Sequence, residues 1–483
     1  MSSAKISLGQ FGLVILLAGQ LLLQLDFSII NVGLAAISAS LKASETELEL
    51  FVSAYGLAFA ICLAMGARLG DNFGRRRIFA IAVVMFGLAS LLCGVANSVM
   101  FLVAARALQG LAAALMVPQI LATIHVTLSG RDHARAVALY GAIGGLAFIV
   151  GQVLGGFLIS ANIAGSGWRS IFLINLPICV LILLCVWRQV PETRGQRNVP
   201  VDWSGTITLA LLTLSILLPT ALGPSLHWSW TCLLGYVPIL PLTALLWRIE
   251  RSKEERGSFP ILPPSLVRIS SMRFGGLIAI IFFTSWSGFM FVFALTLQSG
   301  AGLTPLQSGD ALIALGASYF LSAVVVVPRL SDVRREAVLV AGCLIQMVGL
   351  CLLIVTLEWV WPNPGLVNLI PATALIGFGQ AFIVNCFYRA GLADVPHEHA
   401  GSGSAMLATM QQVSLGLGPA ILGAVFAETL QHSNLYLTAG TTTIMVELGL
   451  MVILLAAAVH RLLSQRGVAP VSAEVEAMIV VPE

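Results

Sequence analysis

The feature that most constrains this chain is a succession of fourteen apolar stretches, each long enough to cross a lipid bilayer. A transmembrane helix needs about 20 consecutive apolar residues. We expect spans at 10–36, 48–66, 78–97, 100–126, 136–160, 170–188, 204–222, 229–247, 274–297, 309–328, 337–358, 366–388, 402–428 and 440–462. The stretches lack the strict alternation that marks a membrane β-barrel. The sequence therefore predicts an all-α polytopic membrane protein.

Composition agrees with this prediction and narrows the class of function. Hydrophobic residues make up 58% and charged residues 10%, whereas a soluble domain carries roughly 25% charged residues. The net charge is only +3, so nucleic acid is not an expected partner. A P-loop is absent, and His397-Glu398-His399 has the wrong spacing for a metal-binding helix. We therefore expect no enzyme activity, no metal and no cofactor other than a proton gradient.

The distribution of lysine and arginine predicts the orientation. With the N-terminus inside, 22 of the 25 basic residues fall on one face, the exceptions being Lys42, Arg169 and Arg106. Cytoplasmic loops of membrane proteins carry this excess of basic residues. We expect a multi-pass protein of the cell (inner) membrane with both termini in the cytoplasm.

A short internal repeat predicts two related halves. Arg68-Leu-Gly-Asp71 is followed by Arg75 and Arg76, and Arg329-Leu-Ser-Asp332 by Arg334 and Arg335. Duplicated bundles are typical of transporters, with the substrate site at the midplane between the halves. The expected organisation is an N-terminal six-helix bundle (1–188), cytoplasmic linkers with two inserted helices (189–273), a C-terminal six-helix bundle (274–462) and a mobile tail (463–483).

Several motifs resemble one family of transporters. The loop Gly66-Ala-Arg-Leu-Gly-Asp71-Asn-Phe-Gly74-Arg75-Arg76 is similar to motif A of the major facilitator superfamily. Further segments resemble the 14-span drug:proton antiporters of that superfamily. They are Leu25-Asp26-Phe-Ser-Ile-Ile-Asn31-Val32, Ser53-Ala54-Tyr55, Arg106-Ala-Leu-Gln109-Gly110, Gly151-Gln152-Val-Leu-Gly155-Gly156, Gly167-Trp168-Arg169-Ser-Ile-Phe172-Leu-Ile-Asn175-Leu-Pro177 and Val201-Asp202-Trp203-Ser-Gly205. The resemblance implies two pseudo-symmetric six-helix bundles that export drugs by alternating access.

Three departures from the family pattern bear on substrate and gating. Ala67 replaces the first glycine of motif A. The segment Gly151-Gln152-Val-Leu-Gly155-Gly156 resembles motif C of the antiporters, and Gln152 replaces the proline of that motif, which removes a kink. The tenth and thirteenth spans lack the extra mid-membrane acids that some multidrug members use for cationic drugs, and the thirteenth carries Gln411 and Gln412 instead. The last departure weakens any prediction of dicationic substrates.

Ionisable residues inside the spans are the candidates for proton coupling, because such groups are costly in a membrane. Asp26 in span 1 is the candidate proton carrier, and the resemblance indicates the same residue. Arg106 in span 4 stays charged and is expected to be its partner. Glu447 in span 14 is a second proton site, a contact for a cation, or a structural group that snorkels to the interface or is bonded between helices. The alternative for Asp26 is a structural carboxylate that is hydrogen-bonded to a neighbouring helix. The alternative for Arg106 is an arginine that binds the carbonyl groups at a helix end.

Motif A and motif C supply candidate gating elements. In motif A, Asp71 can pair with Arg75 or Arg76 around a turn at Gly74, which suits a latch that breaks and re-forms. A plain cytoplasmic hairpin is the alternative. In motif C, Gly151, Gln152, Gly155 and Gly156 let span 5 approach other helices closely. We expect this span to change partner during opening, and packing alone is the alternative.

Amide and aromatic residues at inward-facing positions predict a substrate cavity. In span 1, Gln24 and Asn31 share a face with Gln20 and Ser28, while Asp26 lies on another. The remaining candidates are Tyr55, Trp286, Phe289, Met290, Gln380 and Asn385. An aromatic and methionine-rich cavity with a few amides suits flat, lipophilic compounds, although core packing accounts for such residues equally well.

The sequence thus favours a monomeric, proton-coupled exporter of lipophilic or cationic drugs, whose partners are a small substrate, protons and the bilayer; the sequence leaves a periplasmic adaptor undetermined. Two alternatives remain. One is a dedicated carrier for one metabolite, lipid, siderophore or self-made antibiotic, and the other is a membrane sensor or enzyme on a transporter scaffold.

Overall fold

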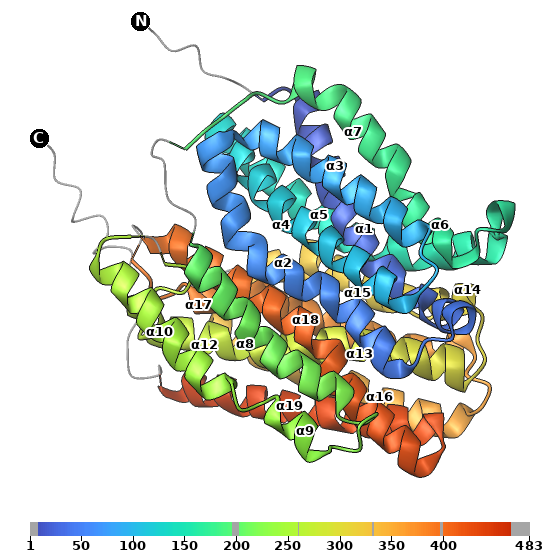
Figure 1. Ribbon diagram of the computed structural model, residues 1–483. Helices are drawn as coiled ribbons and strands as arrows, with labels where there is room; N and C mark the ends of the chain where they lie inside the picture. Colours follow the sequence, from blue (N-terminus) through green and yellow to red (C-terminus); the bar gives the residue numbers. More distant parts are fainter. Residues whose placement is uncertain (1–7, 196–201, 259, 331–332, 397–398, 465–483) are drawn as a thin grey trace, which may run out of the picture.

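The computed structural model describes residues 8–195, 202–258, 260–330, 333–396 and 399–464. Most of the expected tail 463–483, part of the linker 189–203, the second repeat motif at Ser331 and Asp332, and His397-Glu398 lie outside these residues. Within the described residues the secondary structure is helical and contains no strand (Figure 1).

The first half of the chain forms six long helical segments in chain order. They are α1 (Gln10–Leu41), α2 (Glu45–Phe73), α3 (Arg75–Gly94), α4 (Val99–Thr127), α5 (Gly130–Ala161), and α6 (Ser170–Leu173) continued by α7 (Asn175–Gln189). Two inserted segments follow, namely α8 (Trp203–Leu222), and α9 (Trp230–Leu234) with α10 (Ile239–Glu255).

The second half repeats this plan after α11 (Pro264–Val267) with more interrupted helices. They are α12 (Ser270–Ile278) with α13 (Thr284–Leu295), α14 (Pro305–Asp310) with α15 (Ile313–Leu321), α16 (Arg335–Val360), α17 (Leu366–Gly391), α18 (Ala400–Ser433) and α19 (Tyr436–Ser464). Single π-helical turns at Ala279–Phe283 and Thr296–Gly300 follow α12 and α13. Such turns locally rotate the face that a helix presents.

The same helix pairs pack in both halves. In the first half α1 packs on α5, α4 on α2 and α3, and α3 on α7; in the second half α13 packs on α18, α17 on α15 and α16, and α16 on α19. The two bundles meet along two seams, one between α2 and α18 and the other between α5 and the pair α14–α15. These seams are where alternating access would have to open.

The inserted helix α8 covers the first seam, because it packs on α2 and on α18 at once (Figure 1). A small apolar cluster joins the three helices through Leu57, Leu217, Ala221, Leu417 and Ala420. Trp228, in the loop after α8, donates a hydrogen bond from Nε1 to Glu428 Oε2 on α18 at 2.9 Å. The inserted pair is therefore attached to the seam and not only to the linkers.

Thirteen helices in the described residues are long and apolar enough to span a membrane. They correspond to thirteen of the fourteen expected spans. At the place of the fifth, the 32-residue helix α5 contributes only the shorter apolar segment Val150–Ala161 to that count. The count of fourteen expected from sequence is therefore matched at thirteen places.

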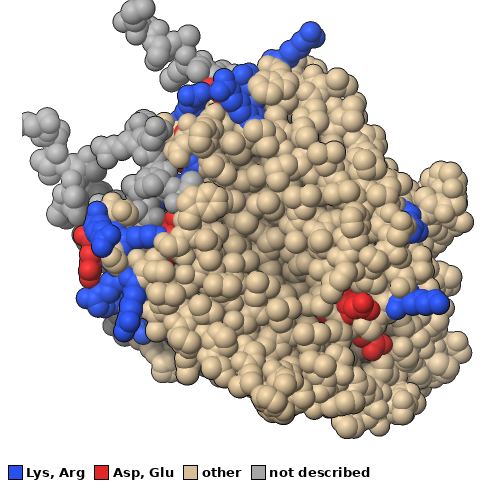
Figure 2. Space-filling view, viewed as in Figure 1, with Lys and Arg blue, Asp and Glu red and all other residues tan. Residues whose placement is uncertain are grey.

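Lysine and arginine side chains gather at one end of the molecule (Figure 2). We call this end, which carries residues 68–77 and 248–256, the basic end, and the opposite end, which carries residues 41–45 and 434–436, the far end. Between the two, the visible surface is almost free of charge (Figure 2). This belt matches a lipid-facing surface.

Candidate coupling site and substrate cavity

Asp26 lies at the centre of a buried polar cluster inside the first bundle. Its side chain is inaccessible to solvent. Arg106 Nη1 on α4 donates to Asp26 Oδ2 at 2.6 Å. Gln109 Nε2, one turn further along α4, and Asn175 Nδ2 on α7 donate to Asp26 Oδ1 at 2.8 and 2.9 Å. The carboxylate thus accepts three hydrogen bonds from two helices besides its own.

The cluster extends to α3 and closes on itself. Gln109 and Asn175 also donate to Ser90 Oγ at 2.8 and 3.0 Å, and Arg106 Nη1 donates to Gln109 Oε1 at 2.7 Å. A buried ion pair is tolerable only when such additional hydrogen bonds satisfy its partners. Because the pair cancels its own charge, the cluster is electrically neutral while Asp26 is ionised.

Helix periodicity explains why these residues meet. Arg106 and Gln109 are three residues apart on α4 and therefore share one face. That face is turned toward Asp26 on α1, Ser90 on α3 and Asn175 at the start of α7. Gly110 on the same helix keeps α4 close to α2, because a methyl group placed there would collide with the Tyr55 carbonyl oxygen. The Arg106 guanidinium also lies over the ring of Tyr55 on α2, with 4.3 Å between Cζ and the ring centroid.

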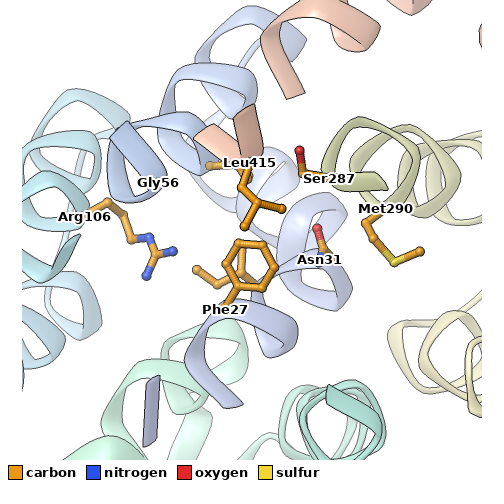
Figure 3. Close-up of a pocket in the computed structure, with 9 residues that line it drawn as sticks. Phe27, Asn31, Gly56, Arg106, Ser287, Met290 and Leu415 are labelled. Atoms are coloured by element: carbon orange, nitrogen blue, oxygen red, sulfur yellow. The ribbon is translucent and has the colours of Figure 1, made fainter. Parts of the chain in front are cut away.

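A small cavity lies between the two bundles next to this cluster. The first bundle contributes Phe27, Ile30, Asn31, Val52, Gly56 and Arg106, and the second Ser287, Met290 and Leu415. Figure 3 shows side chains from both bundles around the same space, with Arg106 entering from α4. Arg106 therefore belongs both to the cavity wall and to the ion pair with Asp26.

The structure brings only some of the expected cavity residues to this space. Asn31 and Met290 line it. Tyr55, Phe289 and Gln380 are buried within a bundle, Gln24 and Trp286 are half-buried, and Asn385 is exposed. Phe289 stacks on Phe293 with ring centroids 5.2 Å apart, and Trp286 stacks on Tyr319 at 6.4 Å. In this conformation these residues contribute to packing or surface more than to the cavity wall.

Glu447 lies in the second bundle, between α19 and α16. It is fully buried, and its Oε1 accepts a hydrogen bond from Gln346 Nε2 at 3.3 Å. Gln346 and Glu447 lie on the third and sixth spans of the second half. Ser90 and Asn175 lie on the third and sixth spans of the first half, so the two polar contacts occupy corresponding places. Glu447 does not line the cavity. This placement favours the inter-helix interpretation of Glu447.

Motif A folds into a charged turn that binds the start of the linker. Arg75 donates to Asp71 Oδ1 from Nη2 at 2.8 Å and from Nε at 3.2 Å. Glu192 Oε1 accepts from the Arg76 backbone N–H at 3.0 Å, and Arg75 N–H donates to the Thr193 carbonyl at 2.9 Å. Gly74 between the two helices has φ +107°, which disfavours a side chain.

Motif C forms part of the second seam. A methyl group placed on Gly156 would lie 2.6 Å from Leu306 Cα of α14, and one placed on Gly309 would lie 2.6 Å from the Gln152 carbonyl oxygen. Gly151 and Gly155 face Ser28 and Ile29 of α1 in equally close contact. Both amide atoms of Gln152 are buried without a hydrogen-bond partner in the described chain. Close contact across this seam therefore depends on glycine.

The change Gly156→Val should open the far end of this seam. Overpacking costs about 1–3 kcal/mol, which would lower the population of the closed far end roughly 5- to 150-fold. Spin labels on cysteines at Asn97 and Leu435, exposed at the far ends of the two bundles, would report the change as a longer distance. Gly449→Val is the matched control, since nothing lies within 4 Å of that position. An unchanged distance in Gly156→Val would contradict the prediction.

Sequence reasoning did not assign a role to Gln109, Asn175 or Ser90, although they complete the Asp26 site. Gln109 and Asn175 stand inside motifs whose resemblance to the family was noted, so a signal was present. Ser90 carries no such signal, because a serine in an apolar span is usually bonded to its own helix.

Two six-helix bundles with a cavity between them form an architecture typical of membrane transporters. The sequence model that describes the Major Facilitator Superfamily matches residues 16–419 of this chain. The chain is 31% identical over 413 residues to the probable actinorhodin transporter of Streptomyces coelicolor, covering 85% of this chain and 71% of that protein. It is 33% identical over 421 residues to the puromycin resistance protein of Streptomyces alboniger, covering 86% and 81%.

Solved structures show the same fold. The crystal structure of a mutant peptide transporter POT in complex with sulfate superimposes with a TM-score of 0.67 at 14% identity, covering 94% of this chain and 97% of that one. This chain belongs to the Major Facilitator Superfamily, whose members are transporters that generally need no cofactor and are not enzymes.

Proposed function

We propose that this protein exports lipophilic, often cationic compounds from the cytoplasm in exchange for protons, as a monomer in the cell (inner) membrane. The basic end is then cytoplasmic, as the positive-inside rule requires. Relatives named for actinorhodin, puromycin and tetracenomycin support an antibiotic or drug as the exported compound. Each proton that enters down 100 mV supplies about 2.3 kcal/mol, enough for roughly 50-fold accumulation of a neutral compound.

The observation that carries the proposal is the double role of Arg106, which lines the cavity and binds Asp26. While Asp26 is ionised, the pair is neutral and a cation can occupy the cavity. When Asp26 binds a proton, Arg106 keeps its charge, and the cluster beside the cavity becomes positive. Proton and cationic substrate therefore exclude each other, which is the competition that antiport requires.

The experiment that tests the proposal is dye efflux from vesicles containing the purified protein. An imposed pH gradient should drive transport of lipophilic cations against their concentration, and dissipating the gradient should stop it. Anionic dyes of similar size serve as the comparison, because the cluster gives no reason for protons to displace them. Absence of gradient-driven flux for every compound in a broad panel would contradict broad drug export.

A dedicated carrier for a single antibiotic is the second candidate. Several relatives are named for one compound, and the cavity is small in this conformation. Flux of one antibiotic with no flux of the remaining panel would favour this candidate while leaving the Asp26–Arg106 coupling intact.

A further inference from the structure

Glu49 on α2 is a buried carboxyl group for which the coupling scheme has no use. It lies four residues after the first residue of α2, about 6 Å along the helix axis, near the far end. Its side chain is nonetheless fully buried. Neither Oε1 nor Oε2 has a hydrogen-bond partner within the described chain.

The contrast with Asp26 and Glu447, the two other carboxyl groups with no exposed area among the described residues, is informative. Asp26 accepts three hydrogen bonds and faces an arginine, so its site suits an anion. Glu447 accepts one hydrogen bond, and Glu49 accepts none. An isolated carboxylate in an apolar environment is too costly to persist and takes up a proton instead. The neutral acid is therefore the form of Glu49 that this conformation can hold.

The second bundle is what buries Glu49. A methyl group placed on Gly423 of α18 would lie 2.5 Å from Glu49 Oε1, so the carboxyl occupies the space that the glycine leaves. Nearer the middle of the same seam, a methyl group on Gly56 would lie 2.7 Å from Gly416 Cα. When the bundles part at the far end, α18 must leave Glu49, and water replaces it.

No described cation on the packed helices is bonded to Glu49. On α2 itself the neighbouring acid is Glu45, which repels a second negative charge. Arg106 on α4 is bound to Asp26 and Gln109. On α18, Glu428 is bound to Trp228 and His432. The helix α8 carries no charged residue. Closure of the seam therefore brings no opposite charge to Glu49.

We propose that Glu49 is a pH-sensitive gating residue, which must bind a proton before the far end can close. In the open conformation the carboxyl is hydrated and ionised, and in the closed conformation it is neutral against Gly423. Closure thus takes up one proton from the far side. Acid on that side favours closure, and the closed population falls as the pH rises.

This proposal rests on the proposed export, with the two bundles opening alternately at the basic end and the far end, but not on Asp26 as the proton carrier. When the far end reopens, Glu49 returns this proton to the far side, so it adds no proton to the exchange itself. Acid outside favours the conformation that loads substrate from the cytoplasm. One linked proton changes the closed-to-open ratio by up to about tenfold per pH unit.

The test measures the distance between spin labels at Asn97→Cys and Leu435→Cys in nanodiscs, without substrate or gradient. The exposed Cys185 and Cys351 are first replaced by serine. In the otherwise wild-type protein the short distance should predominate at low pH and give way to a longer one as the pH rises. Glu49→Gln, which is neutral at every pH, should keep the short distance throughout. Glu49→Met should do the same.

Glu45→Gln is the matched control, since it removes a half-buried acid one turn away. It should keep the change from the short to the long distance, with a midpoint displaced only by the loss of the repulsion between the two acids. A pH response in Glu49→Gln equal to that of the wild type would overturn the proposal. Failure of the coupling at Asp26 gives a different pattern, because Asp26→Asn vesicles would then pump normally while the Glu49-dependent distance change remained.

Discussion

Replacing Asp26 by asparagine should abolish export driven by a pH gradient while the protein stays folded. The amide has nearly the same shape, and its oxygen can still accept the hydrogen bonds from Gln109 and Asn175. It can neither bind nor release a proton. Arg106 then has no counter-charge, so the cluster remains in the positive state that the proposal assigns to protonated Asp26. A cationic substrate would be disfavoured at every pH.

The measurement is efflux of a lipophilic cation from vesicles containing wild type or Asp26→Asn, driven by the same pH gradient. We expect flux from the variant to fall to the level of protein-free vesicles. Exchange of a neutral substrate without a gradient should persist, because it needs the cavity and not the proton. Glu447→Gln is the matched comparison, being a buried intramembrane acid away from the cavity. Undiminished pumping by Asp26→Asn would refute the coupling scheme, and loss of pumping in Glu447→Gln would make that residue a proton site.

Arg106→Ala should destabilise the fold more than Asp26→Asn does, because it removes a whole buried side chain as well as one partner of the ion pair. Removing one partner of a buried ion pair typically costs about 3–5 kcal/mol, because the remaining charge is left without compensation. Here Asp26 Oδ2 would lose the guanidinium that donates to it, and Tyr55 would lose its cation contact. Thermal unfolding of the purified protein in detergent measures the loss.

The double variant Asp26→Asn/Arg106→Ala separates charge from packing. If the uncompensated carboxylate causes most of the loss, the double variant should be more stable than Arg106→Ala alone, since it leaves no charge to bury. Equal instability of the single and double variants would show that Arg106 acts mainly through its packing on the ring of Tyr55.

Most of the architecture followed from the sequence because the bilayer imposes a simple length rule. Thirteen expected spans coincide with apolar helices, and the family expected from the motifs around Asp71, Asp26 and Asn175 is confirmed by the match over residues 16–419. Helix periodicity also placed Asp26 and Asn31 on different faces of α1. In the structure Asp26 lies inside the first bundle, and Asn31 lines the cavity.

The composition of the site was less predictable. Tyr55, Phe289 and Gln380 have the residue types of a cavity wall, yet they are buried in the bundles. A span has several apolar faces of similar character, and its pattern does not say which face meets a neighbour and which meets a cavity. The π-helical turns before and after α13 add a rotation that residue spacing alone does not reveal.

By itself, the sequence determined the membrane environment, the expected orientation and the repeat, and it singled out Asp26, Arg106 and Glu447, because each follows from local composition and from the cost of charge in lipid. It did not single out Glu49, which stands at the start of the expected span 48–66. Only the tertiary structure decided which charges are paired. Asp26 gained three donors from α4 and α7, whereas Glu49 was buried by a glycine 374 positions away in the chain. The strength of an ionisable group's interactions depends on atoms brought within a few ångströms by packing, and no linear pattern records that distance.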